Sequence, residues 1–233
     1  MCDVCEALVS AWKGWADLPP PVCGPALGPW IDLSHTITAD LARSPKHPAP
    51  TIRKIVSQPQ QDANVTEITM VVHFGTHVDA PRHFFLDGPA FERIPLERLY
   101  GPAVVWRLEC EPLMVITADH LKSLRPKVRP GDMVILDTGW WRKVNDPDYE
   151  DHPTVSQDAA QWLVDHRVKM LAVDFSTPDL TAHHRPPDYP FPAHRTLLGQ
   201  GVLIAEHVTN LSLLSGRRVE AMFMGVSIDG ADG

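Results

Sequence analysis

Twenty-three prolines interrupt this chain of 233 residues and leave few places where a long helix can form. Many of them lie in three stretches, at residues 19–29, 45–59 and 178–192. Proline removes a backbone donor and blocks the helical turn before it, so we expect long ordered loops in these stretches. The remaining chain must build its core from short elements.

Short apolar runs supply those elements. Runs rich in Val, Ile and Met, each of strand length, occupy residues 68–74, 104–108, 133–136, 170–175, 201–205 and 221–228. Residues 31–35 predict a further short strand, and 42–61 an irregular loop. Helices are expected at 118–124, capped by Thr117, and at 157–167, capped by Ser156. Unevenly spaced strands that outnumber helices favour a mixed α/β fold over a regular doubly wound sheet.

The length fits one domain with a sizeable core. Residues 1–17 carry Leu8, Trp12 and Trp15 at helical spacing, and the prolines that follow end that pattern. We therefore expect an extension over residues 1–29, a helix and a Pro-rich linker, ahead of the main domain at 30–233. The apolar side of this helix would be suited to cover a neighbouring subunit.

Composition excludes several partners. The net charge of −8 gives no basic excess for nucleic acid or for an anionic membrane surface, and no run of eighteen apolar residues occurs. The first residues lack the charged start and apolar core of a signal peptide. Four cysteines are too few for a secreted disulfide framework, and Cys2 and Cys5 are expected to be terminal thiols despite their C-x-x-C spacing. A cytoplasmic protein is the expectation.

The strongest chemical signal among the twelve histidines is the segment HFGTHVDAPRH. Its candidate ligands, His73, His77, Asp79 and His83, all stand at odd positions. An extended backbone would project them to one side. Gly75 would let the backbone approach an ion closely.

The same segment does not fit the zincin motif, because Phe74 follows His73 where H-E-x-x-H requires Glu, and Gly75 and Pro81 oppose a helix. Neutral imidazole and carboxylate ligands suit Zn²⁺, Mn²⁺ or Fe²⁺. The segment therefore predicts a metal site without fixing the metal. The alternative is that these are ordinary polar residues at the end of a strand.

A second, weaker signal lies downstream. His194 precedes Glu206 by twelve residues, and Glu206 ends an apolar run where a carboxylate is costly unless it is paired or bound to a metal. A surface position at the end of a strand remains the alternative for Glu206. Of the other histidines, His35 and His207 are the best candidates to support the ligands.

The segment from His73 to His83 resembles the H-x-G-T-H-x-D-A-P-x-H signature of a metal-dependent cyclase family that includes bacterial kynurenine formamidase and isatin hydrolase. Supporting similarities are Asp-Leu-Ser at 32–34, Asp-Phe-Ser-Thr-Pro-Asp at 174–179, and Thr-Asn-Leu at 209–211. The resemblance covers roughly residues 30–230. It implies the family's swivelling β/β/α-type fold with a mixed sheet in a single domain.

The resemblance also implies roles. His73, His77 and Asp79 would hold one metal ion, Asp79 would bridge to a second held by His194 and Glu206, and His83 would be catalytic rather than a ligand. One or two Zn²⁺ or Mn²⁺ ions per subunit are implied, in a dimer or larger homo-oligomer.

The implied activity is hydrolysis of an amide C–N bond in a small aromatic substrate, most simply an aryl formamide such as N-formylkynurenine. Phe84, Trp140 and Trp141 are candidates to bind the aromatic ring, although aromatic residues are often ordinary core. Two alternatives stay open. One is an isatin-type lactam or other cyclic-amide hydrolase of the same family, and the other is a metal-binding homologue without catalysis.

Overall fold

The computed structural model describes residues 13–18 and 28–233. Within these residues the strands are β1 (Thr51–Val56), β2 (Val65–Thr69), β3 (His77–Asp79), β4 (Tyr100–Arg107), β5 (Val115–Ile116), β6 (Met133–Asp137), β7 (Thr154–Val155), β8 (Met170–Val173), β9 (Leu203–Glu206) and β10 (Arg218–Met222). The α-helices are α2 (Ala118–Ser123), α3 (Gln157–Asp165) and α4 (Pro192–Gly199). Short 3₁₀ helices include η1 (Pro81–His83), η2 (Phe91–Arg93) and η4 (Trp140–Lys143). No helix among the described residues has the length and apolar character needed to cross a bilayer.

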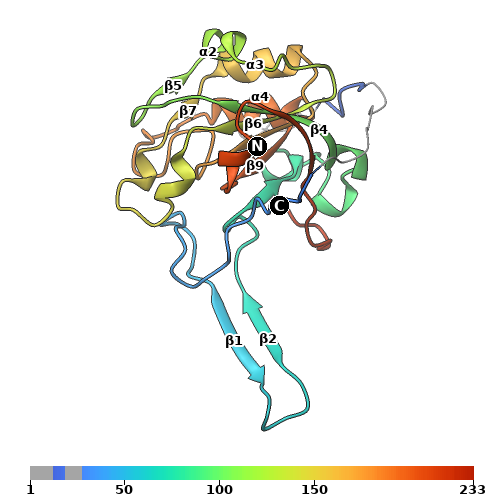
Figure 1. The fold of residues 1–233 in the computed structure, drawn as a ribbon, viewed down its shortest axis with the longest axis vertical. Helices are drawn as coiled ribbons and strands as arrows, with labels where there is room; N and C mark the ends of the chain where they lie inside the picture. The colour runs from blue at the N-terminus through green and yellow to red at the C-terminus, as the bar shows by residue number, and fades with distance from the viewer. Residues whose placement is uncertain (1–12, 19–27) are drawn as a thin grey trace, which may run out of the picture.

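A six-stranded mixed sheet forms the centre of the molecule (Figure 1). Its strand order is β10-β4-β6-β8-β9-β3. The four inner strands are parallel, whereas β10 and β3 pair antiparallel at the two edges. This arrangement confirms the mixed α/β, single-domain fold expected from the sequence.

Alternating side chains of the inner strands build two cores. Val104 and Leu136 face one side, where they pack with residues of α2, α3 and α4. Val105 and Ile135 face the other side, where the covering residues come from η2 and the C-terminal part of the chain. Because both faces are covered, the parallel strands are buried along nearly their whole length.

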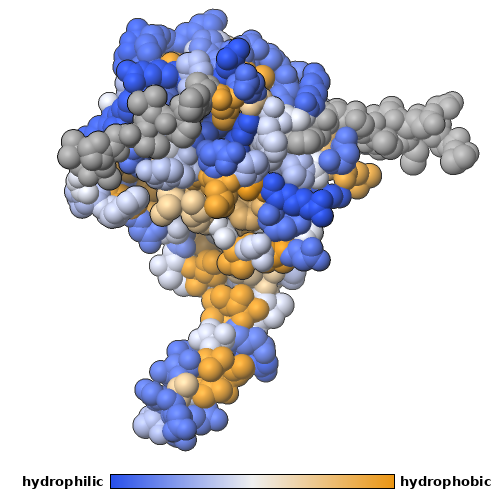
Figure 2. Space-filling view, turned by 90° about the vertical axis from the view of Figure 1, so that its right-hand side faces the viewer, coloured by the Kyte–Doolittle hydropathy of each residue, from blue (hydrophilic) through white to orange (hydrophobic). Residues whose placement is uncertain are grey.

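A β-hairpin made of β1 and β2 projects from this body (Figure 1). Both strands are exposed along nearly their whole length, and the cross-strand pair Ile52 and Ile68 is 40% and 50% exposed. Figure 2 shows apolar surface along this arm and at its base. Two-stranded hairpins are marginally stable alone in water, so this arm lacks the packing that stabilises the body.

Several local predictions were wrong. Residues 31–35 form no strand, because isolated bonds hold them instead of a ladder: Thr209 N–H donates to the Leu33 carbonyl, and the Asn210 amide donates to that of Asp32. The strand expected at 68–74 ends at Thr69, and β1 lies inside the segment expected to be irregular. Residues 51–56 contain no proline, so their backbone N–H groups are available for the hydrogen bonds of that strand.

Helix α4 was not predicted, although Pro192 at its first position is a helix-start signal. The helix expected over 1–17 does not extend into residues 13–17, which have no regular secondary structure. Trp15 there packs beside the Arg98 guanidinium, 4.9 Å from the ring centre. Residues 1–12, with Leu8, Trp12 and the Cys2/Cys5 pair, lie outside the described part of the chain.

A buried carboxyl group stands beside the parallel strands. Both oxygens of Asp174 accept hydrogen bonds from Thr138, one from its hydroxyl at 2.6 Å and one from its backbone N–H at 3.0 Å. Burial, together with the nearby charge of Asp137, raises the pKa of Asp174 to about 7 despite these bonds.

We expect this shift to make stability depend on pH. An aspartate in the unfolded chain releases its proton near pH 3.8, whereas folded Asp174 keeps it to about pH 7. Since the folded state binds the extra proton between these values, its stability falls as pH rises from about 4 to about 7. Urea unfolding across this range will show a smaller loss of stability for Asp174→Asn than for the wild type. Equal pH slopes would contradict the assignment.

Candidate metal centre

The edge strand β3 brings two of the predicted ligands together with a third. His77 pairs with Glu206 of β9 across the antiparallel ladder, and Asp79 lies two residues further along β3. Side chains two residues apart share a face of a sheet, so all three point to the same side. Asp79 is fully buried, and Glu206 is 6% exposed.

His73 and His83 reach the same place by a different route from the one the sequence predicted. Only residues 77–79 are extended in a strand. Before them, Gly75 takes a positive φ of 65° and turns the chain, which lets His73 fold back toward Asp79. After them, Pro81 starts the short helix η1, which ends at His83. The four side chains converge as expected, but through a turn and a helix instead of one extended backbone.

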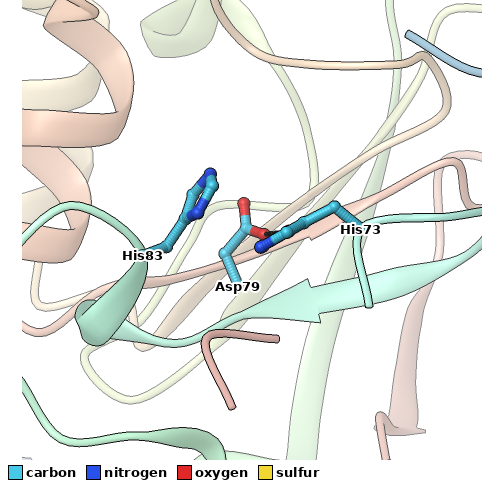
Figure 3. A group of neighbouring side chains, drawn as sticks. All are labelled: His73, Asp79 and His83. Carbon is cyan, nitrogen blue, oxygen red and sulfur yellow. Dashed lines mark ion pairs between the residues drawn. The ribbon is translucent and has the colours of Figure 1, made fainter. Parts of the chain in front are cut away.

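Helix α4 supplies the remaining predicted ligand, His194, which is 4% exposed. Its Nε2 atom lies 3.4 Å from Asp79 Oδ2 and 3.3 Å from Glu206 Oε1. On the other side of Asp79, Oδ1 lies 2.8 Å from His73 Nδ1 and 3.3 Å from His77 Nε2. Asp79 therefore contacts three imidazoles with its two oxygens. Figure 3 shows its carboxylate between His73 and His83.

Asp232 is a site residue that sequence reasoning missed. Its Oδ2 atom lies 3.2 Å from His73 Nε2 and 3.5 Å from His83 Nδ1. The Ala80 backbone N–H donates to the Asp232 carbonyl, which holds this segment beside η1. The segment around Asp232 carries no recognisable motif, and its position depends entirely on tertiary structure.

The charges of the cluster depend on one another. Burial raises the pKa of Asp79, but contacts with His194, His73 and His77 outweigh burial and hold that pKa well below its usual value. Burial likewise lowers the pKa of His73, and Asp79 with Asp232 reverses this and raises the pKa to about 9. Protonated imidazoles therefore balance the buried carboxylate, and a divalent cation would take the place of those protons.

The donor set fits a metal ion. Two groups of atoms each lie within 4.8 Å of one another, one from His73, Asp79 and His83 and one from His77, Asp79 and Glu206. Within the described chain, both oxygens of Asp79, His77 Nε2 and Glu206 Oε1 are buried without a well-formed hydrogen bond. Such atoms are costly unless something binds them. Imidazole nitrogens and carboxylate oxygens are the donors that Zn²⁺ and Mn²⁺ accept.

Aromatic side chains border the cluster. Phe84 stacks on the His194 ring at 4.7 Å between centroids and meets Phe191 edge-on at 5.3 Å. Trp140, in contrast, is 3% exposed, lies in the helix-side core and donates its indole N–H to the Tyr149 carbonyl. Trp141 packs against the opposite core, with the Arg142 guanidinium 4.3 Å from its ring centre. The structure thus brings Phe84 to the cluster and places Trp140 in the core.

Further polar residues form a hydrogen-bonded group next to the ligands. His207 follows Glu206, its ring lies 6.3 Å from that of His77, and its Nδ1 atom is 2.8 Å from the Tyr149 hydroxyl. The Thr76 hydroxyl donates to the His207 carbonyl. It also accepts the backbone N–H of His35, which places the His35 backbone beside the residue that precedes His77.

The chain matches a known protein family over a segment that carries much of this site. The model of the cyclase family matches residues 31–180 of this chain, which include the segment from His73 to His83. The chain therefore belongs to the cyclase family.

Curated relatives of the chain include kynurenine formamidases. That of Bordetella petrii is 32% identical over 139 residues, which are 54% of this chain and 61% of the relative, so the match spans under two thirds of that protein. That of Bacillus cereus is 27% identical over 214 residues, which are 88% of this chain and 93% of the relative.

Solved structures with the same fold extend the comparison. A potential metal-dependent hydrolase with cyclase activity is 26% identical, with a TM-score of 0.71 over 87% of this chain and 92% of its own. Isatin hydrolase A from Labrenzia aggregata, bound to benzyl benzoate, is 22% identical. It has a TM-score of 0.75 over 87% of this chain and 89% of its own, a likeness of fold.

Proposed function

We propose that this chain is a metal-dependent hydrolase of an amide C–N bond and acts as an arylformamidase on a substrate such as N-formylkynurenine. The observation that carries the proposal is the convergence of His73, His77, Asp79, His194 and Glu206, with His83 beside them. The kynurenine formamidase relatives support the choice of reaction.

In this proposal His73, His77 and Asp79 hold one ion, and Asp79 with His194 and Glu206 holds a second where two are bound. The ions are Zn²⁺ or Mn²⁺. A divalent ion in such a site lowers the pKa of water and stabilises negative charge on a carbonyl oxygen. Asp79, which contacts three imidazoles, is the residue best placed to serve both positions.

His83 is proposed to move the proton. Its ring lies beside the ligands, 3.9 Å from the His73 ring centre and 5.9 Å from that of His194, and its side chain is 28% exposed. It would take a proton from the attacking water and give it to the leaving nitrogen, which departs more readily once protonated. Asp232, 3.5 Å from Nδ1, would orient the ring for this transfer.

Phe84 is proposed to bind the aromatic ring of the substrate, because it stands next to both His83 and His194. For Trp140 and Trp141 the same role would require exposed rings. The burial of Trp140 favours a core role for that residue.

Metal loading with two substrates tests the function. We expect protein stripped by a chelator to be inactive, and protein reloaded with Zn²⁺ or Mn²⁺ to hydrolyse N-formylkynurenine. Isatin is the matched alternative, because the same residues would suit a cyclic amide, and faster turnover of isatin would assign a lactam hydrolase. Stoichiometric metal binding without turnover of either substrate, or of a wider amide panel, would assign a non-catalytic homologue.

We also propose a cytoplasmic homodimer in which residues 30–233 form the catalytic unit and 1–29 an extension. The exposed apolar pair Ile52 and Ile68 on the projecting hairpin supports assembly, since exposed apolar surface is usually covered by a partner. Figure 2 shows this apolar surface along the arm. The low cysteine count supports a reducing compartment.

A further inference from the structure

Asp179 is a fully buried carboxylate directly behind one of the proposed ligands. Its Oδ2 atom accepts two hydrogen bonds from His194, from the ring Nδ1 at 2.7 Å and from the backbone N–H at 3.0 Å. Its Oδ1 atom accepts from the Ala193 backbone N–H at 3.1 Å and from the Tyr189 hydroxyl at 3.0 Å. Four donors thus fix the carboxylate, and half of them belong to His194.

These bonds determine the tautomer and the ring orientation of His194. When Nδ1 carries the proton donated to Asp179, Nε2 is left with its lone pair. That Nε2 atom lies 3.4 Å from Asp79 Oδ2 and 3.3 Å from Glu206 Oε1, so once a metal ion replaces its proton the lone pair would point to the place where the two carboxylates meet. Because Asp179 Oδ2 also accepts the His194 backbone N–H, the carboxylate is fixed relative to the His194 backbone. Its bond to Nδ1 therefore limits rotation of the ring.

We propose that Asp179 is a positioning residue that makes His194 a metal ligand, by holding its tautomer and ring orientation. The inference rests on the proposed metal centre and deepens it. Carboxylates that accept the second N–H of a metal-bound imidazole raise its basicity, and their loss typically costs 10–100-fold in metal affinity. The charge of Asp179 would also offset part of the positive charge that a cation brings into this buried site.

The test measures metal binding, not turnover. Metal-free protein is titrated with Zn²⁺ in competition with a chromophoric chelator. We expect Asp179→Asn to weaken the site that includes His194 by about 10–100-fold. The same substitution in a His194→Ala background should cost no more than about twofold, because Asp179 acts through His194. Tyr189→Phe is the matched control, since it removes another partner of Asp179 and should leave affinity within about twofold.

A spectroscopic measurement on the zinc-loaded wild type tests the tautomer without any variant of Asp179. Nitrogen-15 NMR of the imidazoles, with the His194 signals assigned from their absence in His194→Ala, should show a proton on Nδ1 and zinc on Nε2. Zinc on Nδ1, wild-type affinity in Asp179→Asn, or an equal loss in the His194→Ala background would each overturn the inference. If zinc binds as expected but no amide is hydrolysed, the proposed function fails and the role of Asp179 stands.

Discussion

Replacing His83 by alanine is expected to lower kcat by about 10²–10⁴-fold while the protein keeps its full metal content. The imidazole of His83 stands beside the ligand cluster, and an imidazole can both accept and donate a proton. Its side chain is 28% exposed, so truncation leaves the core intact. The measurements are steady-state hydrolysis of N-formylkynurenine and metal analysis of the same preparation.

The metal analysis decides whether His83 transfers a proton or binds the metal. Its ring nitrogen lies within 4.8 Å of ligand atoms of His73 and Asp79, so it could share an ion with them. If His83→Ala loses metal in proportion to activity, His83 is a ligand. If it keeps both metal and full activity, the proton-transfer role is wrong. His166→Ala is the matched control, since His166 is exposed at the end of α3 and its ring stacks on Trp162.

The Asp79→Asn substitution should weaken metal binding more than any other single change. Both groups of candidate ligand atoms include Asp79, and an asparagine offers one neutral oxygen where the aspartate offers two charged ones. We expect affinity to fall by more than about 100-fold, beyond the usual cost of losing a residue behind a ligand, and hydrolysis to fall below detection. Metal content after dialysis against a weak chelator measures the effect.

The loss of charge has a second effect on the same variant. Asp79 balances the imidazoles of His73, His77 and His194, so without its charge these groups will lose their protons at lower pH. Asp119→Asn is the matched control, because Asp119 is exposed and pairs with Lys122 on the surface. Stoichiometric metal in Asp79→Asn, with a normal circular dichroism spectrum, would contradict the bridging role.

The sequence predicted the inner strands of the sheet well and its periphery poorly. Buried parallel strands such as β6 and β8 are continuous apolar runs, and such runs are visible in a single sequence. The strand β1 is half polar and almost entirely exposed, and residues 31–35 are held by single hydrogen bonds without a ladder. Whether each segment found a partner strand decided both cases, since β1 pairs with the adjacent β2 and residues 31–35 join no sheet.

The site residues likewise divide into those that the local sequence identifies and those that only the tertiary structure brings together. His73, His77, Asp79 and His83 were found together because they lie within one short segment. Asp232 and Asp179 were not assigned roles. Asp232 meets His73 only when the C-terminal segment folds against that segment, and Asp179 meets His194 only when the loop before α4 folds back onto the start of the helix. The resemblance to the cyclase family linked His194 and Glu206 to the others, and the structure places His194 in contact with both Asp79 and Glu206.

The position of β3 has a consequence for how the protein would lose its metal. This strand is only three residues long and lies at the edge of the sheet, where β9 is its one ladder partner among the described residues. Short edge strands are the parts of a sheet that fray most readily, because few backbone bonds must break. A metal ion held jointly by β3, β9 and α4 would link these three elements at the edge of the sheet. Fraying of β3 would separate His77 and Asp79 from Glu206 in one event, so ion release and the opening of this edge are expected to be the same motion.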